Sequence, residues 1–180
     1  MDKNLELYYI ALIPPEAIQD EVHEFQHIAA VKFETEVTIK SPAHITIVPP
    51  FSLHIDEVKP MINNINILLK RNYSPIEVSV TRFYHFDHRN IILEVHKGRE
   101  IERLFNDLML VTEGATHHHN NVAKFIPHIT IANRDLSPEV FDKAYDYFNH
   151  ISYGRDFICE TIIVFHFKDG KWLAIKNFRL

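Results

Sequence analysis

The strongest constraint on the fold is a repeat, because the chain carries the same pattern twice at an offset of 84 residues. The tetrapeptide His-Ile-Thr-Ile begins at His44 and again at His128. The same offset superimposes apolar positions of the neighbouring segments: Leu7 on Ile91, Tyr9 on Leu93, Val78 on Ile162 and Val80 on Val164. Strand, helix, histidine-bearing strand, helix and strand therefore occur twice in the same order. This order predicts two similar halves related by a pseudo-twofold axis.

Hydrophobic periodicity assigns the elements of each half. Short β-branched or alternating apolar runs predict strands at 5–13, 43–49, 76–84, 90–96, 127–133, 160–167 and 172–178. Apolar stripes at helical spacing predict helices at 16–30, 55–70 and 99–111, and another after Ser137-Pro138. Asp169-Gly170 suits the turn of a hairpin between the last two strands. We expect an α+β fold in which two antiparallel sheets, flanked by helices, surround a central cleft. Residues 1–180 would form a single domain of two intertwined lobes.

Composition and charge narrow the class of protein. The chain has 180 residues, of which 46% are apolar and 24% charged, as in ordinary globular proteins. It has no apolar run that could span a bilayer and no signal-peptide pattern, so we expect a cytoplasmic monomer away from membranes. Its one cysteine, Cys159, excludes an internal disulfide. The net charge of −5 disfavours duplex nucleic acid but not a small phosphate ester or an RNA end.

The spacing within each motif places its polar residues together. Side chains two positions apart on a strand lie on the same face. His44 and Thr46 therefore point one way, as do His128 and Thr130, while the isoleucines between and after them point into the core. A single His-x-Thr would mean little in a chain with 13 histidines. A histidine alone on a strand is also more often structural than catalytic, but packing does not explain the same pair in both halves.

Two opposed imidazoles suit displacement at phosphorus. One neutral histidine can accept a proton from an attacking water, and the other, as imidazolium, can protonate the departing alkoxide. The hydroxyls of Thr46 and Thr130 can donate to the phosphate oxygens. No carboxylate or further ligand stands near the motifs at metal-binding spacing. We therefore expect a reaction that needs neither a metal nor a cofactor.

With these motifs, the sequence resembles the 2H phosphoesterase superfamily, which is named for its two His-x-Thr motifs and includes 2′-5′ RNA ligases and cyclic phosphodiesterases. The segments YYIALIPP, AHITIVPPF and PHITIAN and the duplicated layout extend the resemblance over nearly the whole chain. It implies hydrolysis of a 2′,3′-cyclic phosphate or another 2′-linked phosphodiester in a small nucleotide or RNA 3′ end. It also implies that His44 and His128 are the acid and base, in an order left open, and that Thr46 and Thr130 bind phosphate.

Four further residues are candidates for the walls of the cleft. Phe51 follows the first motif and either stacks on a base or belongs to the core. Arg134 follows the second motif and either binds a phosphate or is a solvated loop residue. The first strand offers Tyr8 or Tyr9, and the alternation alone does not decide between them.

Other histidines fall outside the motifs. His117-His118-His119 invites a metal-binding interpretation, but three consecutive side chains diverge and no acidic or cysteine partner stands at ligand spacing. We expect these residues in an exposed loop, from Gly114 to Lys124, near the cleft entrance. His85 and His88 lie in a turn that could border the cleft.

Two alternative functions remain open. A non-catalytic protein could bind RNA ends or small phosphates in the same cleft, and it would tolerate loss of either imidazole as a proton carrier. A histidine-rich metal-binding protein is the other alternative. A rate profile with two limbs near neutral pH would favour the enzyme.

Overall fold

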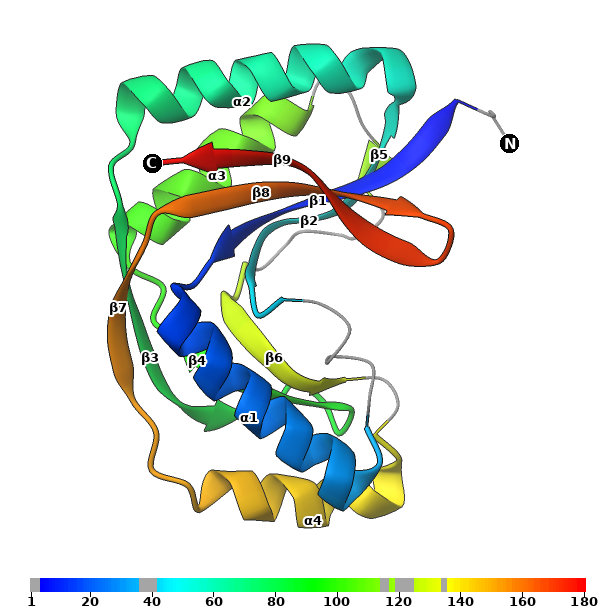
Figure 1. The fold of residues 1–180 in the computed structure, drawn as a ribbon, viewed down its shortest axis with the longest axis vertical. Coiled ribbons are helices and arrows are strands. Elements are labelled where there is room, and N and C mark those ends of the chain that lie inside the picture. Colours follow the sequence, from blue (N-terminus) through cyan, green and yellow to red (C-terminus); the bar gives the residue numbers. More distant parts are fainter. Residues whose placement is uncertain (1–3, 36–41, 114–116, 119–124, 134–135) are drawn as a thin grey trace.

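The computed structural model describes residues 4–35, 42–113, 117–118, 125–133 and 136–180 (Figure 1). Its elements are β1 (Leu5–Ile13), α1 (Glu16–Phe33), β2 (Ile45–His54), a 3₁₀ turn (Ile55–Glu57), α2 (Val58–Asn72), β3 (Ile76–Tyr84), β4 (Asn90–Val95), α3 (Arg99–Glu113), β5 (His117–His118), β6 (His128–Asn133), α4 (Pro138–Asn149), β7 (Arg155–Cys159), β8 (Thr161–Lys168) and β9 (Lys171–Arg179). The α+β class is confirmed, and every predicted strand and helix is present. None of the helices in the described residues is long and apolar enough to cross a membrane.

The first motif strand extends further than predicted. The sequence predicts a short strand at 43–49, flanked by prolines, which lack the N–H that a strand ladder uses. In the structure β2 continues to His54. The pairs Tyr8–Phe51 and Ile10–Val48 leave one extra residue on β2 between them, so a β-bulge accommodates the prolines.

The strands form one antiparallel sheet in the order β7-β3-β4-β6-β2-β1-β8-β9, with β5 beside β2 (Figure 1). The structure thus has one curled sheet where two were predicted. The two halves of this sheet join through a single pair, Ile45 of β2 opposite Ile129 of β6. Hydrophobic patterns identify strands but not which strand edges meet, and this explains the error. The two-lobed, single-domain interpretation stays a prediction.

The order of the strands shows how the two halves of the sequence are connected. β3 pairs with β4, and β8 pairs with β1. The third strand of each half therefore lies beside the first strand of the other half. β7 and β9 add the outer strands.

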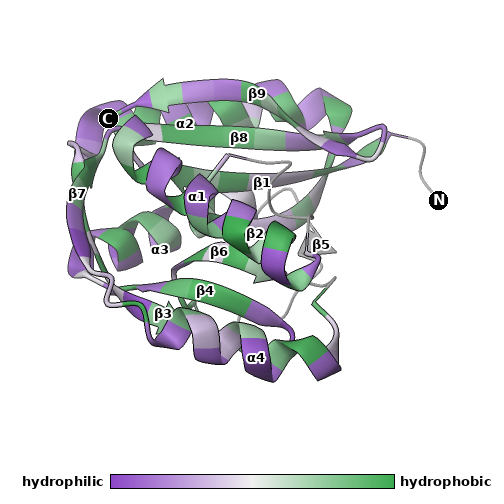
Figure 2. Cartoon of the chain, turned by 60° about the horizontal axis from the view of Figure 1, so that its bottom comes forward, coloured by the Kyte–Doolittle hydropathy of each residue, from purple (hydrophilic) through white to green (hydrophobic). Residues whose placement is uncertain are grey.

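One face of the sheet carries the main core. All four helices contribute to it, with fully buried side chains that include Val22, Ile65, Leu104 and Phe148. Figure 2 shows hydrophobic and hydrophilic bands along α1 and α4, and mainly hydrophobic central strands. A second, smaller apolar cluster is built from strand residues only: Tyr9, Ala11, Ile13 and Phe165, with Ile163 and Trp172 beside them. The sheet therefore carries apolar residues on both faces, and the second cluster contains no helix residue.

Candidate functional site

The repeated motifs meet where β2 pairs with β6. Ile45 lies opposite Ile129, which is the equivalent residue 84 positions later, so a local twofold axis passes between these two strands. Continuing the antiparallel register by one residue in each direction sets each motif histidine opposite the threonine of the other motif. Residues opposite each other share a face of the sheet. Because Ile45 and Ile129 are buried in the main core, four side chains point to the face without helices: His44, Thr46, His128 and Thr130.

Each motif ends on a β-bulge. Ile47 is the extra residue between the β1–β2 pairs Ala11–Thr46 and Ile10–Val48, and Ile131 is its counterpart between the β4–β6 pairs Ile92–Thr130 and Ile91–Ala132. Both isoleucines are fully buried, and so is the residue after each. The bulge ends the regular alternation directly after each motif threonine. Bulges often re-aim side chains beside active sites.

The two histidines have the same backbone contact. His44 Nδ1 lies 2.8 Å from the carbonyl oxygen of Pro42, and His128 Nδ1 lies 2.8 Å from that of Ile126. A carbonyl oxygen only accepts, so each Nδ1 carries a proton and donates it. In the neutral ring the lone pair is then on Nε2. Both motifs therefore offer Nε2 as the atom that can take or give a proton.

Burial lowers the pKa of both histidines. Desolvation is the largest cause in each case, and the bond to the backbone carbonyl opposes it. The charge of His128 further lowers the pKa of His44, so the two rings are close enough to influence each other. Near neutral pH the free protein holds both rings neutral, and the first proton added disfavours the second.

Aromatic side chains surround His44. The ring of Tyr9 lies 5.4 Å from it and that of Phe165 lies 6.3 Å from it, centroid to centroid. Tyr9 stacks on Phe165 at 4.6 Å and meets the edge of Trp172 at 4.6 Å. The structure thus places Tyr9 on the motif face, whereas Tyr8 belongs to the main core.

The β3–β4 turn contacts the other histidine. Phe86 packs edge-on against His128, with ring centroids 5.0 Å apart, and its N–H donates to Asn90 Oδ1 at 2.7 Å. The turn that holds His85 and His88 does therefore border the motifs, through Phe86. His85 and His88 themselves contact aromatic rings of α4. Phe86 could not be identified from the sequence, because a phenylalanine in a turn carries no signal of its tertiary neighbour.

The remaining candidates do not join the motifs. Phe51 is fully buried in the main core, seven residues from His44 along β2 and roughly 20 Å away at strand spacing. Its alternative interpretation, as a core residue, is therefore the one the structure supports. Arg134 and His119 lie outside the described residues, and His117–His118 form β5 beside Phe51 and Ser52.

No group of three histidine, cysteine, aspartate or glutamate side chains is placed to hold a metal within the described ranges. That the site works without a metal stays a prediction.

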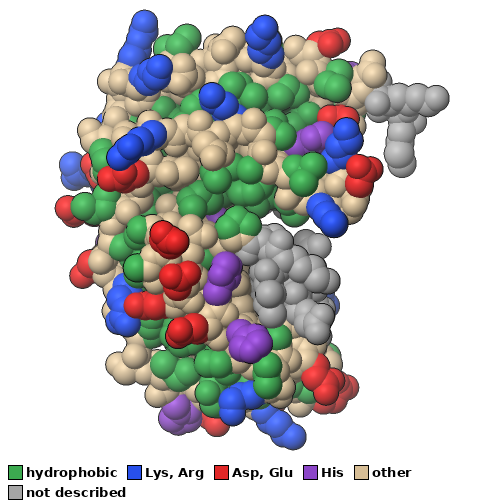
Figure 3. Space-filling view, viewed as in Figure 1, with side chains coloured by type: hydrophobic (Ala, Val, Ile, Leu, Met, Phe, Trp, Pro, Cys, Tyr) green, Lys and Arg blue, Asp and Glu red, His purple; other side chains and the backbone are tan. Residues whose placement is uncertain are grey.

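The face with α1 is unsuited to phosphate, because acidic side chains gather over this helix (Figure 3).

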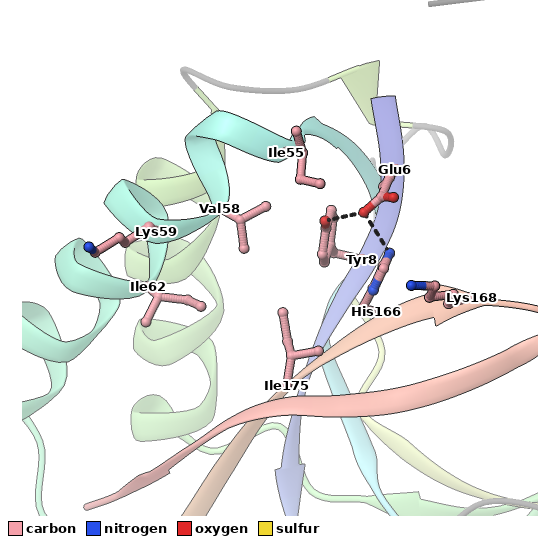
Figure 4. A pocket seen from close by; sticks show the side chains of 9 residues that line it. All are labelled: Glu6, Tyr8, Ile55, Val58, Lys59, Ile62, His166, Lys168 and Ile175. Atoms are coloured by element: carbon pink, nitrogen blue, oxygen red, sulfur yellow. Dashed lines mark hydrogen bonds and ion pairs between the residues drawn. The ribbon is translucent and has the colours of Figure 1, made fainter. Parts of the chain in front are cut away.

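A hollow between α2 and the sheet lies away from the motifs (Figure 4). Its lining residues are Glu6, Tyr8, Ile55, Val58, Lys59, Ile62, His166, Lys168 and Ile175. Tyr8 lines it while its neighbour Tyr9 contacts His44, so the hollow and the motifs lie on opposite faces of β1. Glu6 accepts a hydrogen bond from Tyr8 Oη at 3.0 Å and lies 2.8 Å from His166 Nε2. These polar groups already bond to each other, which fits a structural role.

Sequence comparisons agree with this geometry. A model of the 2′-5′ RNA ligase superfamily matches residues 14–171. A Staphylococcus saprophyticus protein, named as a phosphoesterase, is 26% identical over 175 residues that cover 95% of this chain and 97% of that protein. A Bacillus licheniformis protein with the same kind of name is 21% identical over 173 residues, covering 96% and 98%.

Solved structures share the fold. TT0787 of Thermus thermophilus superimposes with a TM-score of 0.72 at 17% identity, covering 97% of each chain. Escherichia coli LigT in complex with 3′-AMP gives a TM-score of 0.64 at 14% identity, covering 98% of each chain. Identities this low speak for a common fold and not for a common substrate.

Proposed function

Because this chain belongs to the 2′-5′ RNA ligase superfamily of 2H phosphoesterases, we propose that it hydrolyses a 2′,3′-cyclic phosphate or another 2′-linked phosphodiester. The substrate would be a small nucleotide or an RNA 3′ end. One observation carries the proposal. Two histidines with the same tautomer present Nε2 on one face of the sheet, at the point where equivalent strands pair.

The two rings supply the proton transfers of an in-line displacement. The neutral histidine takes a proton from water as the water oxygen bonds to phosphorus. The imidazolium gives its proton to the 3′ oxygen as the bond between that oxygen and phosphorus breaks, which leaves a 2′-phosphate. The two rings have then exchanged protonation states, and solvent exchange restores the first. General acid–base catalysis contributes about 10²–10⁴-fold per group.

The threonines complete the phosphate site. By the register at the β2–β6 pair, Thr46 stands opposite His128 and Thr130 opposite His44. A phosphoryl group between the rings would meet a hydroxyl from each side, and both hydroxyls can donate to its non-bridging oxygens. The bound anion also favours the imidazolium form, so it raises a pKa that burial lowers in the free protein.

Aromatic rings on both sides suit a nucleotide. Tyr9 and Trp172 stand beside His44, and Phe86 beside His128. Base–aromatic stacking stabilises single-stranded nucleotides irrespective of base. Complexes of LigT with 3′-AMP, ATP and NADP⁺ have been solved, so a protein of this fold holds small nucleotides. A monomer in the cytoplasm that does not bind duplex nucleic acid is part of the proposal.

A substrate screen tests the proposal. Purified protein, with chelator present, is incubated with 2′,3′-cyclic nucleotides and 2′-5′-linked dinucleotides, and wild type is compared with His44→Ala, His128→Ala and the double variant. His27→Ala, an exposed histidine on α1, is the matched control. We expect turnover by wild type and His27→Ala only. Nucleotide binding without turnover would favour the non-catalytic binder, and activity abolished by chelator would favour a metal protein.

A further inference from the structure

A buried glutamine of α1 reaches the second motif. Gln26 is only 3% exposed and lies among the core residues of its helix. Its side-chain Nε2 donates to the main-chain oxygen of Thr130 at 3.0 Å, across 104 residues of sequence. A side chain of α1 is thus hydrogen-bonded to the backbone of β6 at the motif threonine itself.

Packing does not explain a glutamine here. Its Oε1 is buried and has no hydrogen-bond partner within the described part of the chain. Turning the amide over would set Oε1 against the carbonyl oxygen of Thr130, and two acceptors do not bond. A buried acceptor without a partner destabilises a fold, and an apolar side chain of similar shape would remove that cost. A buried glutamine under these conditions points to a function for its donor.

The bonded carbonyl lies at the bulge. Ile131 is the extra residue between the pairs Ile92–Thr130 and Ile91–Ala132, so the strand ladder is interrupted beside Thr130. Gln26 supplies a donor to this interrupted backbone. The third buried position of α1 is Gln26, whereas the third buried position of α3 is Leu108, which has no side-chain donor.

We propose that Gln26 is a positioning residue for the second motif, which holds the bulged backbone of β6 so that His128 and Thr130 keep their direction toward the substrate. This inference rests on the proposed phosphodiesterase function. Gln26 lies on the core side of the sheet and does not touch the substrate. Misplacing a catalytic group by about 1 Å can reduce a rate about 10²-fold, so a small backbone shift is sufficient.

The test replaces Gln26 by methionine. Gln26→Met keeps the length of the side chain and removes both the donor and the unpartnered oxygen. The control is Gln19→Met on the same helix, where Nε2 donates to the main-chain oxygen of Pro14 at 3.1 Å. We expect the Tm of Gln26→Met to equal or exceed that of wild type, while kcat falls about 10- to 100-fold and KM changes little. Gln19→Met should keep the wild-type kcat.

A measurement without substrate separates this inference from the proposed function. Proton NMR follows the titration of each histidine ring. When β6 loosens, His128 gains water, so its lowered pKa should rise toward the ordinary value in Gln26→Met, while His44 serves as the internal control. The NMR titration still tests the inference if wild type hydrolyses none of the compounds screened. That result would contradict only the proposed function.

Several outcomes would overturn the inference. Wild-type kcat in Gln26→Met together with an unchanged His128 titration would show that the bond positions nothing. Equal losses of kcat in Gln26→Met and Gln19→Met, or a large fall in Tm, would show a purely structural role. If Gln26→Met does not fold, Gln26→Leu is measured in the same way, and failure of both to fold also counts against it.

Discussion

The residue pair Ile45–Ile129, where the two halves of the sheet join, leads to a quantitative prediction. Ile45 and Ile129 are both fully buried and lie opposite each other where β2 meets β6. An isoleucine-to-alanine change at either position removes every side-chain carbon beyond Cβ from the core. Such changes cost about 2–5 kcal/mol of unfolding free energy. For a domain of this size the Tm falls roughly 2–4 °C for each kcal/mol, so each variant should lose between about 4 and 20 °C.

The pair also predicts how the two changes combine. Residues in contact share a cavity, so the losses in the double variant should depart from the sum of the single losses by about 0.5–3 kcal/mol. Urea unfolding followed by circular dichroism measures all four proteins of this cycle. Ile67→Ala, a half-exposed residue on α2, is the matched control and should stay within about 0.5 kcal/mol of wild type. Losses at Ile45 and Ile129 that add within about 0.3–0.5 kcal/mol, as in two separate sheets, would refute the junction.

Three further predictions concern the site. The unfolded chain takes up protons on His44 and His128 below about pH 6.5, where the folded chain with its lowered pKa values resists them. The unfolding free energy of wild type should therefore be constant above that pH and fall as the pH drops below it. The fall should be shallower in His44→Gln. An equal dependence of unfolding free energy on pH in wild type and His44→Gln would contradict the assigned burial of His44. Phe86→Ala removes the ring against His128 and should lower kcat/KM about tenfold or more if the ring also stacks on a base, whereas wild-type kinetics would remove Phe86 from the site. Glu6→Gln alters the hollow on the other face of β1 and should leave kcat unchanged, and a loss of activity would connect that hollow to the site.

Much of this fold could be predicted because hydrophobic periodicity reports burial. The stripe of Ile101, Leu104 and Leu108 predicts α3, and all three residues are buried. β7 was missed, because in Arg155–Cys159 only the last residue is buried, and Ile158 is 52% exposed. Such an outer strand has the pattern of a loop. Its pairing with β3 is a tertiary fact that five residues do not encode.

In the candidate site too, local features could be predicted from the sequence and tertiary neighbours could not. Alternation along a strand correctly placed His44 and Thr46 on one face, since that property is local. The neighbours of the histidines could not be predicted, because Tyr9 and Phe86 reach them only after distant strands pair. Gln26 was missed for the same reason, since its partner is 104 residues away. The bulges at Ile47 and Ile131 also depend on pairing with β1 and β4.

The most direct test of the two-histidine mechanism is kcat/KM against pH for wild type, His44→Ala and His128→Ala, with a 2′,3′-cyclic nucleotide and chelator. This ratio reports the pKa values of the free protein. Since burial lowers both, the wild-type profile should be a bell with its maximum on the acid side of about pH 6.5. Each single variant should lose about 10²–10⁴-fold in rate together with one limb of the bell. Wild-type rates in either variant, or a complete bell that survives loss of one histidine, would contradict the mechanism.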